Sequence, residues 1–91
     1  MKAHDILSDE SKWTKGTLAR NRLGEPCDYV SQSACKWCVE GALHAAYPSL
    51  VDDYTAAFRL EDETGRKIHK WHDDPETTFQ DVRKLLLKLD V

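Results

Sequence analysis

Two cysteines three residues apart, Cys35 and Cys38, have the spacing of a redox pair or of half a zinc site. Redox pairs of this kind follow a β-strand, and the residues before Cys35 do not predict one. Zinc would need more ligands, and Cys27 and His44 would complete three sulfurs and one nitrogen. On a helix, however, His44 lies nearly two turns beyond the cysteines, which is awkward for one tetrahedral ion. We therefore expect free thiols that pack in the core and no metal or cofactor, with redox and metal sites as alternatives.

Cys38 could also act as a nucleophile, with a histidine as its base and Asp73 orienting that histidine. Three histidines are available for this role: His44, His69 and His72. No spacing fixes any of them near Cys38, and no oxyanion-hole motif accompanies the cysteine. The sequence therefore predicts no catalytic residue, and an enzyme is the weakest of the hypotheses.

The segment 69–74 contains histidines and aspartates that could hold a divalent ion. We favour a loop that enters the last helix, in which Asp73 or Asp74 binds backbone amides and Trp71 fills the core. Asp73 is also expected to form a partly buried ion pair with Arg20, tying the first loop to the last helix. If this pair does not form, Arg20 is free to bind a carboxylate or phosphate of a ligand.

Helical periodicity predicts the elements that position these residues: a mainly α fold with one domain over residues 1–91. We expect helices at 34–46, between Ser49 and Gly65, and after Thr78, with a short one near the N-terminus. Residues 13–33 are predicted to form a long irregular loop, and residues 66–71 fit no single element, with a short extended piece at Ile68 and Trp71 as one interpretation. The result would be a small bundle of about four helices.

Several residues mark the ends and faces of these helices. Capping boxes are predicted at Ser49 with Asp52 and at Thr78 with Asp81. Gly41 lies inside a helix, where it costs about 1 kcal/mol relative to alanine, so we expect another backbone to approach it closely. The apolar face of the middle helix is predicted to turn toward the core and consists of Leu50, Val51, Tyr54, Ala57 and Phe58.

Three segments share a pattern with a known group of proteins. The first, Trp13–Arg20, contains Trp-x-x-Gly followed by Ala-Arg, and the second, Trp37–Leu43, reads Trp-Cys-x-x-Gly-Ala-Leu. The third, Trp71–Pro75, matches Trp-Asn-Asp-x-Pro except that His72 replaces the usual asparagine. In this order they resemble an uncharacterised family of small bacterial and phage-borne domains. The resemblance implies a shared fold, includes Cys38 but not Cys35, and brings no activity with it.

The charge pattern excludes some classes of function. The net charge is −3, and the longest basic cluster is Arg66-Lys67 with Lys70 nearby, which argues against binding to nucleic acid. No apolar run approaches the roughly 20 residues of a membrane span, and the N-terminus lacks an apolar signal region. We therefore expect a cytoplasmic protein that binds neither nucleic acid nor membrane.

These exclusions predict a small interaction or regulatory protein that acts by binding another protein, and the family resemblance implies an origin in a phage or mobile element. The candidate contact residues are Arg20, Trp37, Cys38, Trp71 and Asp73. An exposed aromatic residue would anchor the interface, and the candidates for that role are Trp13, Trp37, Tyr47 and Tyr54. The alternatives are a thiol- or metal-dependent module at Cys35 and Cys38, and a small enzyme or anion-binding protein that uses Cys38 or Arg20.

Overall fold

The computed structural model describes residues 1–91 and contains five α-helices and a small sheet. The helices are α1 (Ala3–Ile6), α2 (Val39–Ala46), α3 (Leu50–Thr64), α4 (Ile68–Asp73) and α5 (Phe79–Leu89). The strands are β1 (Ala19–Arg20), β2 (Pro26–Cys27) and β3 (Lys36–Trp37), and a 3₁₀ turn spans Glu10–Lys12. The prediction of a mainly α fold is confirmed, but the sheet was not predicted. None of the helices combines the length and apolar character that a membrane-crossing helix needs.

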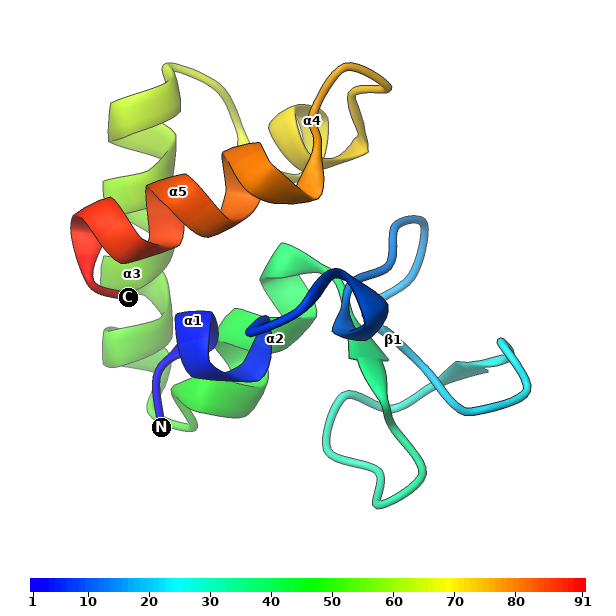
Figure 1. The fold of residues 1–91 in the computed structure, drawn as a ribbon. Coiled ribbons are helices and arrows are strands. Elements are labelled where there is room, and N and C mark those ends of the chain that lie inside the picture. Colours follow the sequence, from blue (N-terminus) through cyan, green and yellow to red (C-terminus); the bar gives the residue numbers. More distant parts are fainter.

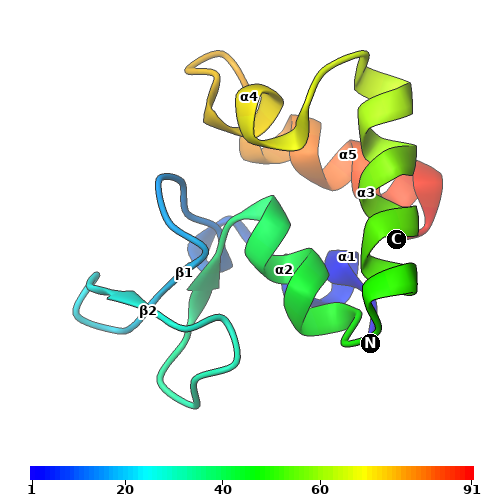
Figure 2. The same cartoon turned by 180° about the vertical axis from the view of Figure 1, so that it is seen from behind.

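Helix α2 lies in the middle of the molecule, with α1 beside it and α3 along one edge (Figure 1). Helix α5 crosses α3, and the sheet lies on the opposite side of α2 from α3, as the reverse view also shows (Figure 2). All five helices contribute to one core. Its fully buried large side chains are Leu7, Val39, Leu43, Leu60, Val82 and Leu86.

The sheet occupies part of the segment predicted to be irregular. Strand β1 pairs antiparallel with β2 and with β3, so that Ala19 lies opposite both Cys27 and Trp37. Each strand is two residues long, which is too short to show the alternating pattern by which strands are recognised in a sequence. The helix predicted at 34–46 begins only at Val39, because Lys36 and Trp37 are paired with β1.

Gly41 lies where two backbones meet, as its place inside a helix predicted. A Cβ atom on Gly41 would lie 2.0 Å from the carbonyl oxygen of Leu18 and 2.8 Å from its carbonyl carbon. The same carbonyl accepts a hydrogen bond from the amide of Cys38 at 3.1 Å. The absence of a side chain at Gly41 therefore lets the first loop lie directly against the start of α2.

The helix ends agree with the sequence at three of four positions. Thr78 Oγ1 accepts from the amide of Asp81 at 3.2 Å while the Asp81 carboxylate accepts from the Thr78 amide, which confirms this capping box. Helix α2 stops before Tyr47-Pro48, and Gly65 ends α3 in a left-handed conformation with φ of 71°. Ser49 stands at the start of α3, but its side chain makes no capping bond, so the first predicted box is wrong.

Residues 68–73 form helix α4, and the predictions of an extended piece and a helix-entry loop there are wrong. The amide of Ile68 donates to the Glu61 carboxylate at 3.0 Å, which satisfies one free N–H at the start of the helix. Asp74 follows the helix, accepts from the amide of Glu76 and pairs with Arg66 at 2.9 Å. The contact between the Asp74 carboxylate and the Glu76 amide is a side-chain-to-backbone bond of the kind that the sequence predicted for residues 69–74.

Candidate functional site

A cleft of about 190 Å³ opens between loop 16–18, the start of α2 and helix α4. Its volume is below the roughly 300 Å³ at which small-molecule pockets usually begin. The ionisable and nucleophilic residues that line it are Cys38, Glu40, His69, His72 and Asp73. The structure thus brings together Cys38, a histidine and Asp73, the three roles considered for a nucleophilic site.

Cys38 stands at the junction of β3 and α2 and caps the helix with its thiol. Its Sγ accepts a hydrogen bond from the amide of Gly41 at 3.2 Å, and the residue is buried. Burial raises the pKa of the Cys38 thiol, and the carboxylates of Glu40 and Asp73 raise it further, against the opposing effect of the Gly41 amide. A thiol held protonated in this way serves as a small capping group and is a poor nucleophile.

His72 has both ring nitrogens engaged. The indole N–H of Trp13 donates to Nε2 at 2.9 Å, so Nε2 is the unprotonated nitrogen and Nδ1 carries the hydrogen that faces Asp73 at 3.3 Å. Burial lowers the pKa of His72 more than the nearby Asp73 raises it, so the ring is held neutral. The basic nitrogen of His72 is therefore not available to Cys38, and no hydrogen bond joins Cys38 to His69, which also lines the cleft.

Arg20 does not pair with Asp73, and the predicted ion pair is wrong. The Arg20 side chain donates to the Thr14 hydroxyl at 2.9 Å and to the carbonyl oxygens of Gly24 and Lys15. These bonds hold the first loop to itself and engage three of the five N–H donors of Arg20. Asp73, at the end of α4, is exposed and faces His72.

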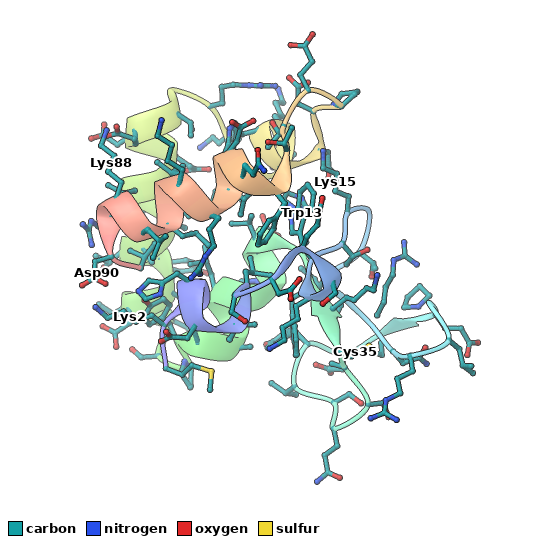
Figure 3. All side chains as sticks on the ribbon, viewed as in Figure 1. Lys2, Trp13, Lys15, Cys35, Lys88 and Asp90 are labelled. Carbon is teal, nitrogen blue, oxygen red and sulfur yellow. The ribbon has the colours of Figure 1, made fainter.

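Lys15 and Trp13 tie the first loop to the C-terminal helices, the role expected of Arg20. Lys15 Nζ donates to the carbonyl oxygens of Asp74 at 2.8 Å and Thr77 at 2.9 Å, in the connection between α4 and α5. Both side chains lie beside the start of α5 (Figure 3). The ammonium group of Lys15 also lies 5.3 Å from the centre of the Trp13 ring. The lysine carried no sequence signal, because its partners are backbone carbonyls.

The two predicted tryptophan contacts, Trp37 and Trp71, are half-buried against the core. The Trp37 indole donates to the carbonyl oxygen of Tyr29 at 3.0 Å, and Trp71 packs from α4. Neither presents an open aromatic surface. Among the four aromatic residues considered as interface anchors, Tyr54 alone is exposed.

The alternative zinc set of Cys27, Cys35, Cys38 and His44 is not assembled. No three histidine, cysteine or acidic side chains lie close enough to share an ion. All three cysteines are free, and the amide of Cys35, just before β3, donates to the carbonyl oxygen of Arg20 in β1 at 2.9 Å. His44 Nδ1 instead contacts the buried carboxylate of Asp53 on α3. Cys35 lies just before β3 and Cys38 just after it, so the two cysteines do not share one helix face, contrary to what the predicted helix at 34–46 implied.

A family model described as a family of unknown function matches residues 1–89 of this chain. The protein belongs to the DUF6197 family. No curated protein and no solved structure matches it. The three segments that carried the sequence resemblance meet at the cleft of this DUF6197 chain, where Gly16, Cys38 and Asp73 all line its wall. Their contacts hold the first loop against α2 and the segment after α4.

A second surface of the DUF6197 chain was missed by the sequence analysis. The apolar residues of α3 that were predicted to face the core lie on the outside: Leu50 is 67% exposed, Val51 73%, Tyr54 57% and Phe58 64%. That prediction is wrong for these four residues, which we call the α3 face. The side of α3 that enters the core carries Asp53, Ala56 and Leu60.

The rotation of α3 about its own axis follows from the pair that Asp53 forms with His44 of α2. Asp53 is 6% exposed, and a buried carboxylate needs a polar partner. Turning Phe58 toward the core would carry Asp53 away from His44. The sequence signal for this pairing was the small separation between an aspartate and a histidine on neighbouring helices, which hydrophobic periodicity does not detect.

Proposed function

We propose that this protein acts by binding a helical segment of another protein on the α3 face. The observation that carries the proposal is the exposure of Leu50, Tyr54 and Phe58, each more than half exposed and each four residues from the next. Residues at this spacing form one line along a helix, here about 12 Å long at 1.5 Å per residue. A partner helix with apolar residues three and four apart matches such a line.

The size of the α3 face suits a partner segment of modest length. A buried aromatic side chain covers about 150–250 Å², and this range, applied to all four residues at their exposed fractions, gives roughly 400–650 Å². Apolar patches of about 300–600 Å² on single-chain proteins are often functional. The area is smaller than the roughly 800 Å² that each partner contributes to a standard interface, so we expect a reversible complex.

The cleft gives weaker support for a function. Its thiol is held protonated, its buried histidine has no free nitrogen and no ion-binding set is present, so neither the thiol or metal module nor the enzyme gains an observation in its favour. A cytoplasmic location is part of the proposal, because three free cysteines suit a reducing compartment.

Amide chemical-shift mapping by NMR tests the proposal with two synthetic probes of about 14 residues. Both are amphipathic helices with leucines at the a and d positions, one with lysine and one with glutamate at the others. We expect at least one probe to shift the amides of residues 50–58, and Phe58→Ala to remove these shifts. Leu23→Ala, which truncates an exposed leucine in the turn before β2, should leave them unchanged. Shifts centred elsewhere, or none with either probe, would contradict the proposal.

A further inference from the structure

We infer that the partner places a lysine or arginine at the C-terminal end of the α3 face, beside its own apolar residues. The inference rests on the proposed function and names the charge of the partner. It starts from a shallow hollow at that end of the helix, formed by Thr55, Phe58, Arg59, Glu61 and Asp62. The hollow joins the ring of Phe58 to two carboxylates, the combination that accommodates the aliphatic stem and charged head of a basic side chain.

Asp62 is the carboxylate in this hollow that is free to bind. It is exposed and makes no hydrogen bond or ion pair within the chain. Glu61 is already engaged, because its Oε2 accepts from the amide of Ile68 and its Oε1 lies 4.0 Å from Lys67 Nζ. Arg59 lines the same hollow but forms no ion pair with Asp62, and its guanidinium donates to the carbonyl oxygen of Leu89 on α5 at 2.7 Å.

The C-terminal end of α3 is acidic in its own residues, and the cations near it belong to other segments: Lys88 beside Glu63 and Lys67 beside Glu61. No basic residue lies in its last turn, which instead carries Glu61, Asp62 and Glu63. The free carbonyl groups there act as a partial negative charge, so a cation supplied from outside is stabilised by the helix end as well as by Asp62. Glu63 points to another element, because it pairs with Lys88 of α5.

The same charges disfavour a second copy of this chain as the occupant. Helix α3 carries five acidic residues and one arginine, so two copies of it would face each other with like charge. The whole chain has a net charge of −3, which adds to the repulsion at low salt. A basic amphipathic segment of a different protein complements both the α3 face and the unpaired carboxylate of Asp62.

The test compares the affinities of the lysine and glutamate probes for the intact protein by fluorescence anisotropy at low salt. We expect the lysine probe to bind at least tenfold more tightly. Asp62→Asn should weaken it by about two- to tenfold, as removal of an exposed ion pair near a helix end does. Glu63→Gln removes the same charge one residue away, on the side of Lys88, and should change the affinity by less than about twofold.

The outcomes separate this inference from the proposed function. Equal binding of both probes, or no effect of Asp62→Asn, would overturn the requirement for a cation; if the amide shifts over residues 50–58 persist, the binding face itself stands. Loss of all shifts with both probes would overturn both proposals. Sedimentation that shows a dimer of the chain abolished by Phe58→Ala would also overturn the inference, because the α3 face would then bind a second copy.

Discussion

Replacing Gly41 with alanine tests the contact that holds the first loop on α2. The added Cβ would lie 2.0 Å from the Leu18 carbonyl oxygen, and the two atoms need roughly 3.5 Å. Both sides of the contact are backbone, so relief requires a shift of the loop by roughly 1.5 Å. No side-chain rotation can supply it.

The expected loss follows from three contributions. Overpacking of this kind costs about 1–3 kcal/mol, and a shift of Leu18 also weakens the bond from the Cys38 amide, worth about 1 kcal/mol. Alanine returns about 1 kcal/mol as a better helix former. We therefore expect Gly41→Ala to lose about 1–3 kcal/mol of the roughly 5–14 kcal/mol of stability typical for 91 residues.

Urea unfolding followed by tryptophan fluorescence measures this loss. Gly24→Ala is the matched control, because Gly24 has φ of 80° but no atom within 4 Å of its added Cβ. The control should lose only about 1 kcal/mol, from the left-handed conformation. If Gly41→Ala is as stable as the parent, or more stable as helix propensity alone predicts, the close approach of Leu18 does not exist.

Three further predictions concern single residues. Thr78→Ala should lose about 1 kcal/mol in urea titration with the capping bond to Asp81, and an unchanged midpoint would reject that cap. The pKa of His72 is lowered in the folded state by burial, so the unfolded chain binds more protons; the stability that the neutral ring contributes should be present above pH 6.5 and fall as the pH drops below 6.5. His72→Asn should flatten that fall, and an equal slope in the variant would show that another group titrates. The buried thiol of Cys38 should react with a maleimide far more slowly than Cys27 and Cys35 in the native protein, and rapid native labelling of Cys38 would contradict its role as a protonated cap.

Local features of the fold were predictable from the sequence. The Thr78 capping box involves residues three apart, and Gly65 ends a helix by its own backbone freedom, so neither depends on the rest of the chain. Gly41 was predictable because glycine is disfavoured inside a helix unless another backbone needs the space. The two-residue strands were not, since their pairing is set by distant partners rather than by their own pattern.

Hydrophobic periodicity could not predict which side of α3 faces the core, because the helix has apolar residues on two sides. The larger side chains, among them Tyr54 and Phe58, favoured the wrong side. The core accepted Ala56 and Leu60 instead, where the pair between Asp53 and His44 fixes the helix. A burial prediction that weighs only hydrophobic size misses such a polar constraint.

The candidate site was predictable in its members but not in its bonds. Cys38 and Asp73 do line one cleft, yet Arg20 turns back into its own loop. Lys15 connects the first loop to the C-terminal helices, as was expected of Arg20, by donating to backbone carbonyl oxygens. Every residue has such a carbonyl, so the sequence does not mark which ones act as acceptors. The bonding in this region depends on the path of the loop, which the sequence leaves open.

The outward orientation of the α3 face is the central claim, and the free energies of unfolding of Phe58→Ala and Leu60→Ala test it most directly. Leu60 is fully buried, so its truncation should cost about 2–5 kcal/mol, whereas truncation of the exposed Phe58 should cost less than about 0.5 kcal/mol. The two residues lie on one helix two positions apart, and the helix propensities of leucine and phenylalanine differ by only a few tenths of a kcal/mol, which is small against the expected difference. A loss of about 3 kcal/mol or more in Phe58→Ala would mean that Phe58 belongs to the core, and would contradict the binding surface derived from its exposure.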